Sequence, residues 1–94
     1  CKVYITINKN SSRRSQLNLC KDITSKYSQF SNIIICLYEN NQIGKKLAMG
    51  FDEEVSIEQK KQFWLGMYTY NSVEGEFFDD NPSGYLGHYK KNNI

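Results

Sequence analysis

Apolar residues gather most densely at residues 32–38, Asn-Ile-Ile-Ile-Cys-Leu-Tyr. The run is rich in β-branched residues, and polar, turn-forming residues bound it on both sides. Six consecutive apolar residues are too few for a typical helix, and an unbroken run suits a strand that is covered on both faces. We therefore predict that residues 32–38 form the central strand of a sheet.

Two amphipathic patterns precede this strand. In residues 2–8 apolar and more polar positions alternate, which is the pattern of a half-buried strand. In residues 17–27 apolar side chains recur every three or four positions, which predicts an amphipathic helix with Ser12 as its N-cap. Two strands that flank a helix in this way usually pair in parallel, with a right-handed crossover.

Two shorter helices are predicted after the central strand. The apolar positions within residues 43–49 indicate a turn or two of helix that ends at Gly50. Ser56 and Gln59 have the spacing of a capping box, in which each side chain bonds to the backbone of the other residue. A short helix over residues 57–62 follows from that box.

The aromatic stretch at residues 63–70 favours a third strand, because aromatic residues and Thr suit a pleated surface. Gly66 within it indicates a bulge or a close backbone approach. A longer helix over residues 57–68 is the competing interpretation. The alternation of the strand places three aromatic residues on one face: Trp64, Tyr68 and Tyr70.

Residues 71–94 hold several Gly and Asn residues and the single Pro, so we expect an irregular C-terminal tail. The predicted fold is a single α+β domain over residues 1–94. It is a βαββ sheet of three strands with one main amphipathic helix on one face and short extra helices. The third strand is expected to lie antiparallel beside one of the first two. A length of 94 residues with 39% apolar and 23% charged residues fits one globular domain.

Charge is divided unevenly along the chain. Residues 1–30 hold six basic side chains and one acidic, whereas residues 51–80 hold eight acidic and two basic. Such segments either attract one another within the fold, present a dipolar surface to a partner, or form ordinary solvated faces, and base rates favour solvated faces. A nucleic-acid-binding alternative takes its phosphate contacts from five basic residues: Lys9, Arg13, Arg14, Lys21 and Lys26.

The three cysteines have no CxxC spacing, and an odd count is not a complete disulfide framework. Cys20 lies on the apolar stripe of the predicted helix and Cys36 lies in the central strand, so we interpret both as small core residues. Whether the two pair between helix and sheet stays open. Cys1 has two interpretations: a lipid-carrying first residue of a bacterial lipoprotein, or a trimmed start.

No catalytic, cofactor-binding or metal-ligating motif stands clear of background. Residues 79–84 resemble the first half of a calcium loop, but Lys90 stands where such a loop has its Glu, and we interpret the stretch as a surface turn. His88, the only histidine, would need an exposed cysteine beside it to activate a nucleophile. We therefore predict no enzyme, no cofactor and no metal.

The order strand, helix, strand, then a third strand with Gly66 and alternating aromatic residues resembles small uncharacterised bacterial domains of lipoproteins and mobile-element proteins. The resemblance rests on residues 3–7, 17–27, 33–38 and 63–71. It implies the same fold and a location at the cell envelope, with the cytoplasm as the alternative. No activity comes with it.

The function that we predict is non-catalytic protein binding, or a structural role, with an unknown protein partner. An aromatic sheet face provides large, rigid side chains of the kind that anchor protein interfaces. The membrane is involved only through a lipid on Cys1. The residues expected to contact the partner are Trp64, Tyr68, Tyr70 and Tyr85.

Overall fold

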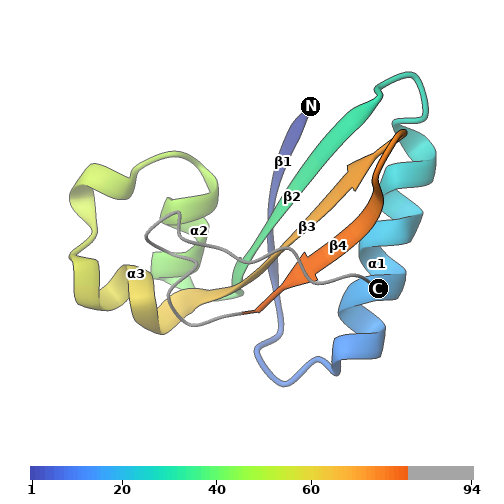
Figure 1. Ribbon diagram of the computed structural model, residues 1–94. Helices are drawn as coiled ribbons and strands as arrows, with labels where there is room; N and C mark the ends of the chain where they lie inside the picture. The colour runs from blue at the N-terminus through green and yellow to red at the C-terminus, as the bar shows by residue number, and fades with distance from the viewer. Residues whose placement is uncertain (81–94) are drawn as a thin grey trace.

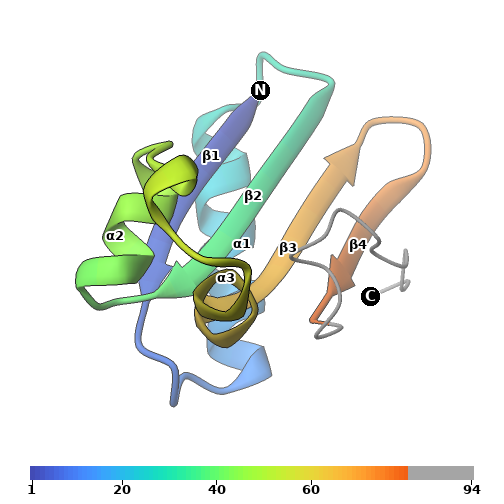
Figure 2. The same cartoon turned by 90° about the vertical axis from the view of Figure 1, so that its left-hand side faces the viewer.

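The computed structural model describes residues 1–80 of the 94-residue chain, and they form an α+β domain (Figure 1). In chain order its elements are β1 (Lys2–Ile7), α1 (Arg13–Lys26), β2 (Asn32–Glu39), α2 (Gln42–Ala48), the 3₁₀ turn η1 (Asp52–Glu54), α3 (Ile57–Phe63), β3 (Trp64–Asn71) and β4 (Gly75–Asp79). The four strands form one sheet in the order β1-β2-β3-β4. Helix α1 lies on one side of the sheet, and α2 and α3 lie on the other (Figure 2).

The first three elements form the predicted parallel unit. Strands β1 and β2 run parallel, with Val3 aligned to Ile35, and α1 is the crossover between them. The predicted N-cap of α1 is confirmed, because the Ser12 hydroxyl oxygen accepts a hydrogen bond from the backbone N–H of Ser15 at 3.1 Å. This bond satisfies one of the N–H groups that a helix start leaves without a partner.

Strand β4 corrects the prediction of a three-stranded sheet with an irregular chain from residue 71 onward. The strand pairs antiparallel with β3 across a tight turn. In that turn the Asn71 side-chain oxygen accepts hydrogen bonds from the backbone N–H of Val73 (2.8 Å) and of Glu74 (3.1 Å), and Gly75 has a φ of 92°. Asn and Gly are the residues that such turns require. The sequence of the strand, Gly-Glu-Phe-Phe-Asp, does not alternate apolar and polar positions, however, so no strand pattern shows in it.

Strand β3 runs antiparallel to β2 and begins directly after α3, which excludes the competing longer helix. The register shifts at Leu37 and Tyr38, which pair with Gly66 and Trp64, so that β3 contains one extra residue there. The bulge predicted at Gly66 is confirmed. The close backbone approach is present as well, because a Cβ atom on Gly66 would lie 3.1 Å from the backbone carbonyl oxygen of Asp79.

The bulge changes which aromatic residues share a face of the sheet. Tyr68 and Tyr70 pack into the core on the α1 side. Trp64 instead packs edge-on against Tyr38, with ring centroids 6.0 Å apart and an angle of 74° between the planes. Tyr38 alternates with the buried Leu37 and therefore faces the side opposite α1. The predicted common face of Trp64, Tyr68 and Tyr70 is wrong, because one extra residue inverts the alternation.

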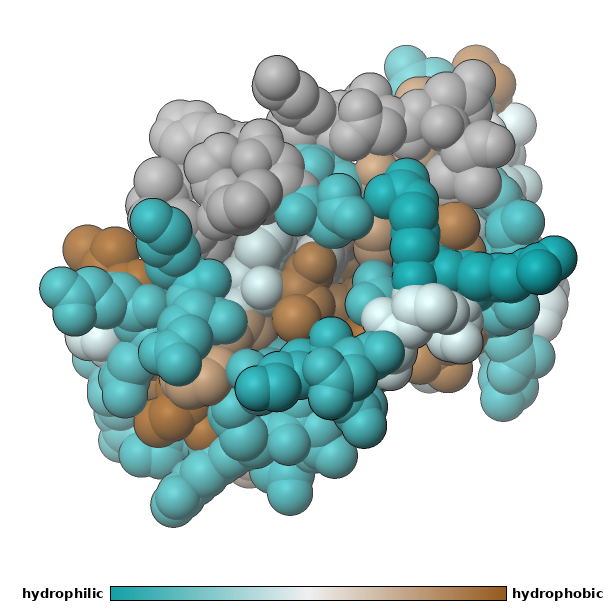
Figure 3. All heavy atoms as spheres, turned by 90° about the horizontal axis from the view of Figure 1, so that it is seen from below, coloured by the Kyte–Doolittle hydropathy of each residue, from teal (hydrophilic) through white to brown (hydrophobic). Residues whose placement is uncertain are grey.

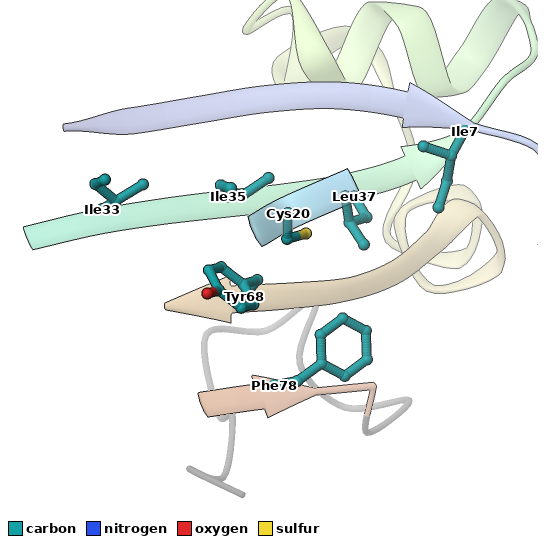
Figure 4. Close-up of a cluster of buried hydrophobic side chains, with 7 residues drawn as sticks. All are labelled: Ile7, Cys20, Ile33, Ile35, Leu37, Tyr68 and Phe78. Carbon is teal, nitrogen blue, oxygen red and sulfur yellow. The ribbon is translucent and has the colours of Figure 1, made fainter. Parts of the chain in front are cut away.

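The core lies between α1 and the sheet. Strands β1 and β2 supply aliphatic side chains, α1 supplies a cysteine, and β3 and β4 supply one aromatic ring each (Figure 4). Burying one large apolar side chain stabilises a fold by about 1.5–3 kcal/mol. The buried cluster consists of Ile7, Cys20, Ile33, Ile35, Leu37, Tyr68 and Phe78.

Helices α2 and α3 form as predicted. The side chain of Asn41 caps α2 by accepting a hydrogen bond from the backbone N–H of Gly44 at 2.7 Å, and Gly50, with a φ of 86°, follows the end of the helix. The predicted capping box of α3 is present. A Cβ atom on Gly44 would lie 1.8 Å from the carbonyl oxygen of Glu39, so α2 packs directly against the end of β2.

Candidate functional site

The four aromatic residues predicted to contact a partner do not form one surface. Tyr68 is fully buried between the sheet and α1. Trp64 and Tyr70 are half-buried and lie on opposite faces of the sheet. Tyr85 lies outside the described residues. An aromatic anchor of a protein interface has to be accessible before binding, and Tyr68 is not.

The basic residues of the nucleic-acid alternative are largely paired with acidic side chains. The ion pairs join Lys9 to Glu39 (3.8 Å), Arg13 to Asp80 (3.2 Å), Lys21 to Glu76 (3.8 Å) and Lys26 to Asp22 (3.5 Å). Within the described part of the chain, Arg14 has no such pair. The oppositely charged segments of the sequence therefore attract one another inside the fold. Exposed pairs contribute only about 0–1 kcal/mol each, so nucleic-acid binding stays a prediction.

All three cysteines are free thiols, and only Cys1 is exposed. Cys20 belongs to the core on the α1 side, whereas Cys36 alternates with the core residues of β2 and faces the other side of the sheet. The sheet separates the two thiols, so they do not pair. Burial raises the pKa of Cys20 to about 12 and also raises the pKa of Cys36. Both thiols stay protonated at neutral pH, and neither is a reactive nucleophile.

Within residues 1–80, no group of three or more His, Cys, Asp or Glu side chains is placed to hold a metal ion. None of the helices in the range is both long and apolar enough to cross a membrane. The stretch compared with a calcium loop continues beyond residue 80, and it and His88 lie outside the described residues.

Three large apolar side chains with high exposure lie between the end of α2 and the start of α3, in residues 49–57, here called the contact segment. Met49 is 70% exposed, Phe51 is 49% exposed and Ile57 is 65% exposed. Leu47 and Val55, next to them in sequence, are buried and fix the segment to the domain. Figure 3 shows apolar side chains among hydrophilic ones at the α2–α3 side of the molecule. Three large exposed apolar side chains within nine residues of the chain make this segment the candidate interaction surface.

Carboxylates border the contact segment. Glu53 and Glu58 are exposed, and no ion pair within the described part of the chain engages either of them. Glu54 is paired with Lys46 at 3.9 Å. An apolar centre with a charged border is the usual composition of a protein interface.

Sequence reasoning missed this segment for a physical reason. Met49 counts as an apolar helix position in the pattern, and nothing in the pattern separates an apolar residue that is buried from one that is exposed. A signal was present, because Phe51 stands beside three consecutive acidic residues after a helix-ending Gly50. Connections usually lie on the surface, although Val55, which follows the same acidic residues, is buried.

Comparison of the chain with protein-family models, with curated proteins and with solved structures found no match. Function is therefore inferred from the geometry of the chain itself.

Proposed function

We propose that the chain is a non-catalytic protein-binding domain, and that its contact segment docks onto the partner. The observation that carries the proposal is the exposure of Met49, Phe51 and Ile57 within nine residues of a well-anchored connection.

The energetics favour a contact of moderate strength. Three large apolar side chains contribute about 1.5–3 kcal/mol each when they are buried. Association itself costs about 4–15 kcal/mol, so the apolar centre alone gives weak binding. The remaining affinity has to come from the border. Because the border carries unpaired Glu53 and Glu58, the partner should present basic side chains around an apolar centre.

The location at a bacterial cell envelope remains part of the proposal on the sequence argument alone. The intact mass of the protein purified from its own source tests it. A lipid-modified Cys1 would place the domain on a membrane surface, whereas an unmodified extension before Cys1 would remove the envelope argument.

Site-specific photo-crosslinking tests the docking surface. We would replace Phe51 with the photoreactive residue p-benzoylphenylalanine, express the chain in its source and identify crosslinked proteins by mass spectrometry. Val73 provides a matched control, because it is 90% exposed and lies on the turn between β3 and β4. The expected result is one dominant adduct from position 51 and no such adduct from position 73.

A second variant shows whether the adduct depends on the apolar centre. Met49→Ser combined with Ile57→Ser, in the crosslinking chain, should abolish the adduct, because the partner then loses its apolar contacts. An adduct that survives these substitutions, or that forms equally from position 73, would contradict the proposal.

A further inference from the structure

A groove of about 430 Å³ opens at the C-terminal end of α1, where β2 begins and β3 ends. This position is at the other end of the molecule from the contact segment (Figure 1). Its volume is within the range of small-molecule sites. Three side chains form apolar walls: Phe30, Ile33 and Tyr70. Six others line it with hydroxyl or amide groups: Thr24, Ser25, Ser28, Gln29, Ser31 and Ser72.

Most of these polar groups are available to a ligand. Within the described part of the chain, no hydrogen bond engages the side chains of Ser28, Gln29, Ser31 or Ser72. Only Thr24 and Ser25 are committed, since each donates to a carbonyl oxygen of α1, at 2.8 Å and 2.7 Å. The groove therefore offers at least four side chains that can both donate and accept hydrogen bonds.

Among the residues that the structure describes, no charged side chain lines the groove. On α1 the nearest charged residues in sequence, Lys26 and Asp22, form an ion pair with each other. The C-terminal end of a helix carries a partial negative charge and disfavours anions. A cation, on the other hand, would find no carboxylate among the described lining residues. The lining therefore suits an uncharged ligand.

A buried polar atom lies behind the groove. Tyr68 is fully buried, and its hydroxyl has no hydrogen-bond partner within the described part of the chain. Figure 4 shows this hydroxyl directed toward the end of the sheet where Ile33, a groove residue, lies. Burial raises the pKa of Tyr68, the Glu76 carboxylate adds to the shift, and the hydroxyl of Thr24, another groove residue, opposes it. The Tyr68 hydroxyl thus lies in the interior near Thr24, a groove residue, although Tyr68 itself does not line the groove.

The backbone around the groove argues against an added peptide strand. The backbone N–H of Ser72 donates to the carbonyl oxygen of Ser31 at 3.0 Å, and Asn32 pairs with Asn71. These ladder groups are already used, so an extended peptide gains no main-chain bonds from them. Recognition has to come from side chains, which suits a compact ligand with many hydroxyl groups.

We propose that this groove binds a neutral saccharide. Sugar rings have apolar C–H faces that pack on Phe30 and Tyr70, and hydroxyl edges that pair with Ser28, Gln29 and Ser72. The inference is independent of the protein-docking proposal, because the two surfaces share no residue.

Titration of the full chain, followed by the backbone amide NMR signals, tests this inference. The probes are three neutral trisaccharides that differ in linkage or in substituent: cellotriose, maltotriose and N,N′,N″-triacetylchitotriose. With at least one of them we expect saturable shifts confined to residues 24–33 and 70–72. One shallow groove supports a dissociation constant of about 1 mM.

Variants show whether the shifts arise from the proposed contacts. Phe30→Ala should weaken binding about tenfold, because Phe30 is 42% exposed and provides a stacking surface without supporting the core. Gln29→Ala should weaken it less. Gln62→Ala, an equally exposed amide at the end of α3, is the matched control and should leave binding unchanged.

Two outcomes would overturn the inference. One is the absence of saturable shifts with all three trisaccharides at about 10 mM, ten times the expected constant. The other is equal or stronger binding of a capped, uncharged pentapeptide of Gly, Ser and Phe, which would make the groove a peptide site. Neither outcome bears on the crosslinking result at position 51.

Discussion

The sheet and the contact segment use the same residue types in opposite ways. Side chains in the sheet are buried at their positions, whereas their counterparts in residues 49–57 face outward. The matched pairs, with their exposed fractions, are Phe78 (0%) and Phe51 (49%), Ile35 (0%) and Ile57 (65%), and Met67 (7%) and Met49 (70%). The difference teaches that place in the fold, and not residue type, decides whether an apolar residue stabilises the domain or remains available to a partner.

Truncating the buried phenylalanine should have the largest effect. Phe78→Ala is expected to lower the free energy of unfolding by about 3–5 kcal/mol, because it leaves a cavity between α1 and the sheet. Phe51→Ala should lower it by only about 1 kcal/mol, because about half of that side chain is exposed. Urea unfolding of both variants at neutral pH measures the difference. Equal losses would show that the contact segment belongs to the core.

High pH should lower the free energy of unfolding, because the core between α1 and the sheet contains the buried Cys20 thiol. The unfolded Cys20 thiol has an ordinary pKa near 9.0, and burial raises the folded value to about 12. The folded state therefore holds its proton while the unfolded state loses it. Stability is unaffected below pH 9 and falls by about 1.4 kcal/mol per pH unit between pH 9 and pH 12.

The contribution of Cys20 to this pH dependence can be isolated. Cys20→Ala should be less stable than the native chain at pH 7, but its stability should fall less steeply above pH 9. The comparison is necessary because the raised pKa values of Cys36 and Tyr68 act in the same direction. Parallel pH profiles for the two proteins would contradict the buried, protonated state of Cys20.

Much of the fold can be predicted from the sequence, because the apolar residues of β1, α1 and β2 recur with clear periods. The helix caps also depend only on residues close together in sequence. The faces of β3 are not readable, since a single extra residue opposite Leu37 and Tyr38 inverts the alternation. Strand β4 is short, and its evidence is a turn signal at Asn71 and Gly75 that is easily assigned to a loop.

The candidate surfaces were harder to predict than the elements. The ion pairs of Arg13 and Lys21 join residues more than fifty positions apart, so no local pattern can show that these two basic side chains are paired. Exposure of Phe51 depends on how α2 and α3 pack against the sheet. The groove combines residues from α1, β2 and β3, and only Tyr70 among them was a predicted site residue.

The central claim is that the exposed side chains of the contact segment do not stabilise the fold. The free energy of unfolding of one triple variant tests this claim most directly. The variant carries Met49→Ser, Phe51→Ser and Ile57→Ser together, and urea unfolding compares it with the native chain. We expect a loss of only about 1 kcal/mol with an unchanged urea dependence, because exposed apolar residues add little to stability. A loss of about 3 kcal/mol or more would mean that these side chains pack within the domain, and it would contradict their assignment as a docking surface.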